Sequence, residues 1–342
     1  MKRALWMHLA LALGVTTLAA PAAANPAVGT ISTFTGNLAS TGCVNPEGIS
    51  IDLRGNIYTG SAATTAIGHV CQFTPQGALT TVFPIPAGPG GLVSILGVFW
   101  QPPNTVFALD FADTLVNKGA TNGRVIAVNT ASGVVTTISS GFEFPNGFAQ
   151  DLEGNLYVAD SFLGNITRIR QDGSNKTVWS SSPLFAGNPT AYYPIGINGI
   201  QFDLLFQNLY ASNTTNRQII RVPVGPGWTA GTPEVFADGP TLDTKESATG
   251  SLLGADGITF DLFGNLYVAA NAANEIQVLS PAAQIVARYG STPGNPTPLI
   301  DVPASPLFLG DQLYFTNVSL YDGGKNSSVS VLQTALPGIP PL

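Results

Sequence analysis

The stretch ADGITFDLFGNLYVAAN, residues 255–271, decides the fold. Ile258, Phe260 and Leu262 alternate with small or polar residues, Gly264-Asn265 interrupts the run, and a second apolar run follows. Alternation with a period of two, then a Gly-Asn pair, then another apolar run predicts two short antiparallel strands joined by a tight turn.

The same pattern recurs along the chain. Clear copies are PEGISIDLRGNIYTGS (46–61), PNGFAQDLEGNLYVADS (145–161) and INGIQFDLLFQNLYASN (197–213), and weaker ones are LGVFWQPPNTVFALD (96–110) and SPLFLGDQLYFTN (305–317). Copies lie roughly 45 to 60 residues apart, the period of propeller blades built from four strands. Two further strand-like runs follow every copy but the last. We therefore predict an all-β fold, a six-bladed β-propeller of four-stranded antiparallel blades.

The sixth copy is followed by only one strand-like run, residues 328–332. Its missing outer strand has a donor near the N-terminus, GTISTFT at residues 29–35, which is similar to the fourth-strand runs of other blades. We expect this N-terminal strand to pair with the last blade and close the ring, because closure removes exposed sheet edges. The alternative for such hairpins is an open sandwich or barrel.

Residues 1–24 have the features of a secretory signal peptide: Lys2 and Arg3, an apolar run, and three alanines before Asn25. We predict cleavage and a secreted or periplasmic protein, with residues 25–342 forming a single propeller domain. A membrane anchor is the alternative for this segment. No other stretch is long and apolar enough to span a bilayer.

The charge balance limits the possible partners. The chain has 13 Lys and Arg against 20 Asp and Glu, and charged residues make up only 10%. An acidic chain with no basic cluster is a poor binder of nucleic acid or anionic membranes. We expect a monomer whose partner is a small-molecule substrate or ligand.

Cysteine and histidine are scarce. Cys43 and Cys71 are the only cysteines, and both fall in the first predicted blade. An oxidising compartment favours a disulfide between them, although spacing alone does not place their Cα atoms within bridging range. Without its leader the chain has one histidine, His69. This argues against His-based zinc sites and Ser-His-Asp triads.

One position of the repeat points to a site. The residue before the glycine of each copy belongs to the strand that should line the central channel, so the six residues should meet on the axis: Glu47, Leu96, Asn146, Asn198, Asp256 and, more loosely, Ser305. Two carboxylates and two amides are hard oxygen ligands suited to Ca²⁺, Mg²⁺ or Mn²⁺ and acceptable to Zn²⁺. The alternative is structural, since Asn and Asp before Gly commonly form turns and caps.

These motifs resemble the gluconolactonase/regucalcin-like family, which includes luciferin-regenerating enzymes and senescence-marker proteins: six-bladed propellers with one divalent metal on the axis. The resemblance implies that Glu47 in PEG, Asn198 in ING and Asp256 in ADG hold one divalent cation (Ca, Mg, Mn or Zn). It implies that Asn146 in PNG orients the substrate. The cation would polarise a lactone carbonyl, and Asp256 would be both ligand and general base.

The sequence departs from the family pattern in ways that bear on substrate. Members acting on sugar lactones commonly carry Arg where this chain has Phe144. This argues against a polar sugar acid and leaves a less polar lactone or ester, or no substrate, as the alternatives. Three long segments, 112–123, 187–196 and 238–254, should border the site, and the last is the expected lid. Within the second, Tyr192 and Tyr193 are expected to contact substrate or, alternatively, to pack between blades.

Two other functions compete with hydrolysis. NHL-repeat propellers share the same Gly-Asn hairpin without the metal, so the chain could instead be a non-enzymatic propeller binding a ligand or protein on one face. A lyase of the virginiamycin-inactivating type is a weaker third reading. Such lyases depend on histidine, and His69 does not fall at a channel position.

Overall fold

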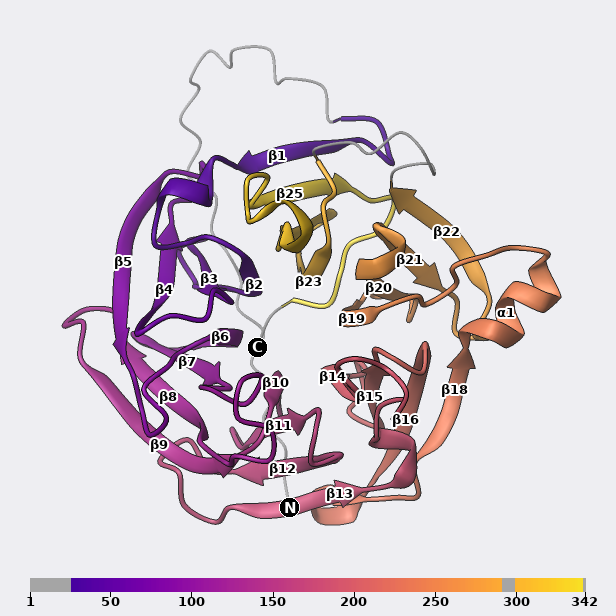
Figure 1. The fold of residues 1–342 in the computed structure, drawn as a ribbon. Coiled ribbons are helices and arrows are strands. Elements are labelled where there is room, and N and C mark those ends of the chain that lie inside the picture. Colours follow the sequence, from indigo (N-terminus) through magenta and orange to yellow (C-terminus); the bar gives the residue numbers. More distant parts are fainter. Residues whose placement is uncertain (1–25, 291–298, 341–342) are drawn as a thin grey trace, which may run out of the picture.

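Six antiparallel sheets stand in a ring around a central axis in the computed structural model, which describes residues 26–290 and 299–340 (Figure 1). The predicted six-bladed propeller is confirmed. The expected leader lies outside the described residues.

Each blade contains four main strands, the first of them innermost. The first three blades consist of β2 (Pro46–Ile51), β3 (Ile57–Ser61), β4 (Ile67–Phe73) and β5 (Leu79–Pro86); β6 (Ile95–Gln101), β7 (Thr105–Asp110), β8 (Gly123–Asn129) and β9 (Val135–Phe142); and β10 (Pro145–Gln150), β11 (Leu156–Asp160), β12 (Asn165–Ile169) and β13 (Thr177–Ser181).

The fourth blade has an additional short strand. The last three blades consist of β14 (Ile197–Phe202), β15 (Asn208–Asn213), β16 (Gln218–Gly225) and β18 (Glu234–Asp238), with β17 (Thr229–Ala230) also on β16; β19 (Ala255–Phe260), β20 (Leu266–Ala270), β21 (Glu275–Leu279) and β22 (Ile285–Gly290); and β23 (Pro303–Leu309), β24 (Gln312–Asn317), β25 (Ser328–Gln333) and β1 (Ile31–Thr35).

Helical structure is sparse and lies between strands. The described residues contain one α-helix, α1 (Gly239–Glu246), and 3₁₀ turns at Leu38–Ser40, Pro183–Phe185, Pro226–Trp228, Asn271–Ala273 and Leu320–Asp322. No helix in the described part of the chain has the length and apolar character needed to cross a membrane.

The N-terminal strand closes the ring, as predicted. β1 pairs antiparallel with β25, with Ile31 opposite Leu332, and forms the outer strand of the sixth blade (Figure 1). Phe34 on β1 packs edge-to-face on Tyr314 of β24, with ring centroids 5.2 Å apart. Every blade therefore has its full set of strands.

The repeated Asp-x-x-Gly-Asn turn follows from local hydrogen bonding. In the fifth blade, Asp261 Oδ1 accepts hydrogen bonds from the backbone N–H groups of Phe263 and Asn265, each at 2.9 Å. Gly264 adopts a φ of +82°, which favours glycine. The Asn265 side chain donates to Asp261 Oδ2 at 2.7 Å. This bonding fixes the hairpin and hence the direction of each inner strand.

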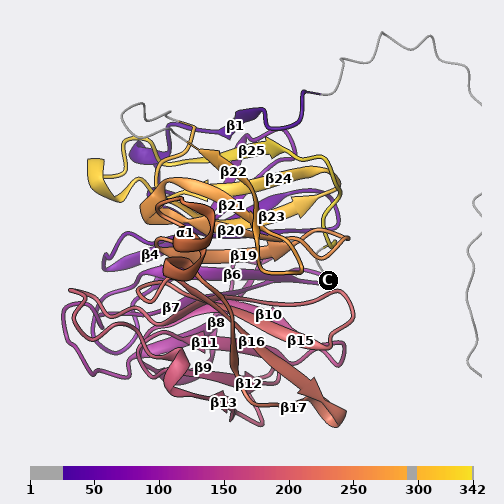
Figure 2. The same cartoon turned by 90° about the vertical axis from the view of Figure 1, so that its right-hand side faces the viewer.

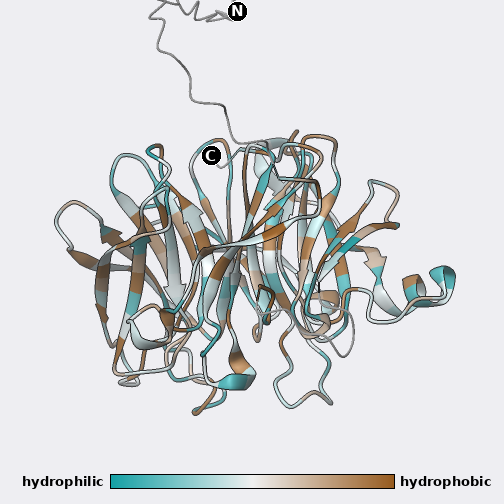
Figure 3. Ribbon diagram, turned by 90° about the horizontal axis from the view of Figure 1, so that it is seen from above, coloured by the Kyte–Doolittle hydropathy of each residue, from teal (hydrophilic) through white to brown (hydrophobic). Residues whose placement is uncertain are grey.

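The core is divided among the interfaces between blades. On the strands visible in Figure 3, apolar and polar residues alternate, and no single apolar layer crosses the molecule. Neighbouring blades interlock through aromatic contacts: Tyr157 of β11 meets Phe202 of β14 edge-to-face at a centroid distance of 5.1 Å. The predicted disulfide is also present, joining Cys43 to Cys71 of β4 with Cα atoms 5.9 Å apart.

Glycine allows the inner strands to touch at the axis. A Cβ added to Gly199 would lie 2.6 Å from the Gly257 Cα of the next blade and 2.7 Å from the Asp256 carbonyl oxygen. Gly48, Gly97, Gly147 and Gly257 are equally crowded by the backbone of the following blade. These five residues form a glycine ring, and each one directly follows an axial residue.

We expect Gly199→Ala to lower the free energy of unfolding by about 3 kcal/mol, because the methyl group meets backbone that cannot move aside. Urea unfolding measures this. Gly36→Ala is the matched control, since its Cβ would meet only Thr33 Cγ2 at 3.4 Å, and it should change stability little. Equal effects of the two substitutions would contradict the packing argument.

Candidate functional site

The axial position is defined by strand register. In each blade, the first residue of the inner strand pairs with the last residue of the second strand, and the axial residue comes next. In the fourth blade, Ile197 pairs with Asn213, so Asn198 is the axial residue. In the sixth blade Pro303 pairs with Asn317, so the axial residue is Ala304, and Ser305 occupies the glycine position. The assignment of Ser305 to the ring was therefore wrong. The axial ring consists of Glu47, Leu96, Asn146, Asn198, Asp256 and Ala304.

The four polar members of the axial ring are all buried. Glu47 is 7% exposed, Asn146 4%, Asn198 5% and Asp256 6%. A cavity of about 350 Å³ runs along the axis, and Glu47, Asn146 and Asn198 line it together with the glycine ring. The structure thus brings together the side chains singled out from sequence as metal-binding or substrate-binding, apart from the two tyrosines.

Both axial asparagines are oriented by hydroxyl groups. Ser161 Oγ donates to the Ile197 carbonyl at 2.6 Å, so it accepts from Asn146 Nδ2, at 3.3 Å. Thr214 Oγ1 donates to the Ala255 carbonyl at 2.9 Å and accepts from Asn198 Nδ2 at 3.1 Å. Because the amide nitrogens face the hydroxyls, each amide oxygen points the other way and is available to a ligand.

Asp256 is only half satisfied. Its Oδ2 accepts a hydrogen bond from Asn271 Nδ2 at 2.9 Å. Its Oδ1 is buried and has no hydrogen-bond partner among the described residues. A buried carboxylate oxygen without a partner is costly unless a proton or cation compensates it.

Ser161, Thr214 and Asn271 share one structural position, directly after the second strand of their blades. In the first blade the corresponding residue is Ala62, whose side chain cannot form hydrogen bonds. The Glu47 carboxylate accordingly receives no hydrogen bond from the described residues. Sequence analysis did not single out Ser161 or Thr214. Their position, one residue beyond the repeated strand, becomes meaningful only once the register is known.

Burial dominates the electrostatics of the two carboxyl groups. Burial raises the pKa of Asp256 from 3.8 to about 7, although the side chains of Asn271 and Asn198 and the Gly257 N–H act in the opposite direction. Burial, and secondly the charge on Asp256, raise the pKa of Glu47 well above its usual range. In the absence of a cation, ionising both groups at neutral pH is therefore unfavourable.

The axial carboxylates stand apart from other acidic groups. No cluster of three or more His, Cys, Asp or Glu side chains that could hold a metal ion occurs in residues 26–290 and 299–340. A cation at this site would need amide oxygens in addition to Glu47 and Asp256. Asn146 and Asn198 supply such oxygens.

One side of the axial ring is apolar. Phe144 stacks between Phe111 and Phe162, with ring centroids 4.6 and 4.7 Å apart, and this cluster includes axial Leu96. Phe144 is buried in this stack and is not among the residues that line the axial cavity. Asp160, also near this rim, accepts the backbone N–H groups of Glu143 and Phe144 and is structural.

Tyr192 and Tyr193 lie away from the axial cavity, and neither lines it. Tyr192 is 81% exposed, and its ring packs edge-to-face on Tyr193 at a centroid distance of 4.6 Å. Lys118 Nζ lies 5.6 Å from the Tyr192 centroid, which brings the loop after β7 against the loop after β13. Their predicted contact with substrate stays a prediction.

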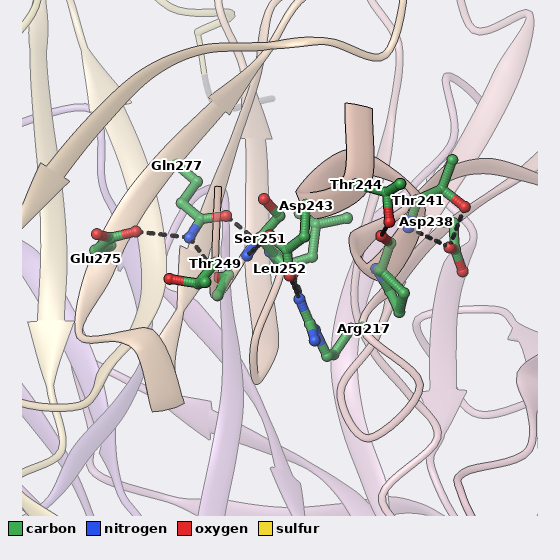
Figure 4. Close-up of polar contacts among 12 residues, drawn as sticks. Arg217, Asp238, Thr241, Asp243, Thr244, Thr249, Ser251, Leu252, Glu275 and Gln277 are labelled. Carbon is green, nitrogen blue, oxygen red and sulfur yellow. Dashed lines mark hydrogen bonds and ion pairs between the residues drawn. The ribbon is translucent and has the colours of Figure 1, made fainter. Parts of the chain in front are cut away.

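The expected lid is anchored at the rim. Helix α1 lies outside the ring between β18 and β22 (Figure 1), and it faces the viewer in the turned view (Figure 2). Arg217 forms an ion pair with Asp243 of α1, and Gln277 accepts from the Leu252 N–H at 2.8 Å (Figure 4). Asp238 caps the helix by accepting from the Thr241 N–H at 2.9 Å. The helical part of segment 238–254 therefore does not cover the axis.

Solved structures of low identity share this fold. Regucalcin from Agrobacterium tumefaciens, described as a calcium-binding protein, is 17% identical, with a TM-score of 0.61 over 90% of this chain and 97% of its own. A gluconolactonase from Xanthomonas campestris is 15% identical, with a TM-score of 0.56 and 86% of each chain covered. Virginiamycin B lyase from Staphylococcus aureus is 14% identical, with a TM-score of 0.57 over 89% and 99%.

The predicted likeness to gluconolactonase/regucalcin-like propellers is thus confirmed at the level of the fold. A lyase has the same fold, so the likeness does not select a reaction. No protein-family model matches the chain, and no curated protein is similar enough in sequence to count as a relative. Function must be argued from the axial site.

The raised pKa of Asp256 makes stability depend on pH. The folded protein holds this proton more tightly than the unfolded chain does, so the metal-free protein should lose up to about 4 kcal/mol as the pH rises from about 4 to about 7. Urea unfolding of chelator-treated protein measures the loss.

Asp256→Asn should lose much less stability over this range, because the amide cannot ionise. The remaining loss would come from Glu47, whose pKa is also raised. If Asp256→Asn and the parent declined equally, Asp256 would not be the group responsible.

Proposed function

We propose that this protein is an exported hydrolase of lactones or esters that depends on a divalent cation at the axial ring. The observation that carries the proposal is the buried, unpartnered Oδ1 of Asp256, in electrostatic contact with the buried Glu47 carboxylate. A divalent cation would compensate both charges and satisfy the free oxygen.

The donor set fits such an ion. Glu47, Asp256 and Asn198 supply two carboxylates and an amide oxygen, with Asn146 adjacent, and hard cations prefer oxygen ligands of this kind. When bound, the cation supplies Lewis-acid activation of a carbonyl group. Asn198 in ING is the amide that the family resemblance assigns to the cation, and Asn146 in PNG is the adjacent amide.

The surrounding residues divide the remaining tasks. Asp256 would hold the cation through Oδ1 and take a proton at Oδ2 as general base, and Asn271 keeps Oδ2 in place. Asn146, fixed by Ser161, directs its amide oxygen toward the substrate. Phe144 stands where members acting on sugar lactones commonly carry Arg, and this difference favours a substrate less polar than a sugar lactone.

Two further observations support the proposal. Regucalcin and a gluconolactonase share the fold, and the first is described as a calcium-binding protein. Export is supported by the leader-like sequence at residues 1–24 and by the Cys43–Cys71 disulfide, because disulfides persist in oxidising compartments.

Elemental analysis tests the cation. Protein purified without chelator should carry about one equivalent of Ca, Mg, Mn or Zn, which Asp256→Ala and Glu47→Ala should lose because each removes a charged ligand. The control Glu234→Ala alters an exposed carboxylate on the outer strand β18 and should keep the ion.

Activity tests the reaction. With alkyl lactones and esters, Asp256→Ala should lower kcat/KM about a thousandfold or more, since it removes both a ligand and the base. Absence of the ion from the parent even after soaking with each metal would overturn the hydrolase proposal. A non-enzymatic propeller that binds its ligand on one face would then be the better description.

A further inference from the structure

The axial cavity continues well beyond the axial ring. It follows the inner strands from Glu47, Asn146 and Asn198 to the turns at their far ends, where it reaches Leu204 and the C-terminal residues Ile339 and Pro340. We name this part, from the glycine ring to Ile339, the lower channel. The whole axial cavity has a volume of about 350 Å³, which is within the range of small-molecule sites.

Apolar side chains from different blades line the lower channel. Phe99, Phe148, Ile258 and Leu307 contribute to its wall, and Phe99 and Phe148 lie side by side with ring centroids 6.4 Å apart.

Two of its polar side chains are engaged with neighbouring blades. Gln150 donates to Gln101 Oε1 at 2.7 Å, and Ser50 Oγ accepts from the Trp100 N–H at 2.8 Å. The lining also includes Gln201, Thr259, Ser305 and Asp203, of which Asp203 is hydrogen-bonded within its own turn. The wall therefore combines apolar contact from several blades with a few polar side chains, and it ends at the polar axial ring.

The C-terminal segment forms a defined end to the channel. The Ile339 N–H donates to the Phe260 carbonyl, and the Leu262 N–H donates to the Pro337 carbonyl, each at 2.9 Å. The yellow segment after β25 accordingly runs in to the centre of the ring (Figure 1). Ile339 is thereby held against the channel by backbone hydrogen bonds.

Exposed apolar side chains lie at this end of the molecule. The turns between the first and second strands of the blades carry Leu53 (86% exposed), Leu152 (68%), Leu205 (70%) and Phe263 (66%). Turns at a surface normally carry polar residues at such positions. These turns lie at the end of the molecule where the inner strands end, the same end that the lower channel reaches at Leu204.

We propose that the lower channel binds an unbranched aliphatic chain, with the polar end of the ligand at Glu47, Asn146 and Asn198. The inference rests on the proposed hydrolase function and narrows its substrates to lactones or esters that carry such a chain. A sugar derivative would place hydroxyl groups against Phe99, Phe148 and Leu307, where they find no partner. An aliphatic chain needs no partners and gains free energy with each methylene buried.

Binding of octanoate, decanoate and dodecanoate to the purified full chain, measured by calorimetry, tests the proposal. Each added methylene should strengthen binding about fourfold until the chain reaches Ile339. Leu307→Trp, which narrows the channel, should weaken dodecanoate binding tenfold or more. Val286→Trp is the control, since Val286 lies on the outer strand β22 and is 57% exposed.

Affinity that does not depend on chain length, or that Leu307→Trp leaves intact, would overturn the lower-channel assignment and place the ligand on the exposed leucines. Unfolding midpoints and metal content of Leu307→Trp show whether the variant is folded with its axial site intact. Chain binding in a protein that takes up no metal would reject the hydrolase proposal alone. Hydrolysis of short lactones without any chain-length effect would reject this inference alone.

Discussion

The close approach of the inner strands at the glycine ring is the constraint on which the rest of the structure depends. Without side chains at Gly48, Gly97, Gly147, Gly199 and Gly257, neighbouring strands meet backbone to backbone. The residue before each glycine then lies at the central axis. Packing therefore brings Glu47 and Asp256 together, although they belong to the first and fifth blades. Only the sixth blade differs, with Ala304 and Ser305, and its small side chain leaves the axis to the polar members of the other blades.

This convergence is expensive in free energy. Two buried carboxyl groups lose the free energy of hydration. Hydrogen bonds from Asn271 and the Gly257 N–H offset only part of this loss, and only at Asp256. Ser161 and Thr214 meanwhile turn both amide oxygens away from internal partners. A purely structural core would satisfy these groups among themselves. The axial ring is instead arranged so that the missing interactions must come from a proton, an ion or a ligand.

Much of the fold and of the site could be predicted because the chain repeats. Six copies of one hairpin fix the blade count, the strand GTISTFT identifies the closing partner, and one position of the repeat identifies the four polar axial residues. The sixth axial residue could not be placed, because the Pro-Ala-Ser-Pro sequence of β23 lacks the glycine that marks the register. Ser161 and Thr214 lie just outside the repeated strands, so only the register reveals their role. The position of α1 depends on its ion pair with Arg217, in the turn before β16, and loop length alone gave no hint of this contact.

The pairing of β1 with β25 also governs how the molecule assembles. These strands are separated by nearly the whole described chain. Each intervening blade can therefore form from local contacts before β1 pairs with β25 at the closing seam. Until then β25 has a bare edge, able to pair with a strand from another molecule. The seam is thus the step of highest entropic cost in assembly and the point of greatest exposure to aggregation. A short N-terminal strand, outside every repeat and remote from the axis, determines whether the five self-contained blades and the incomplete sixth become one closed ring.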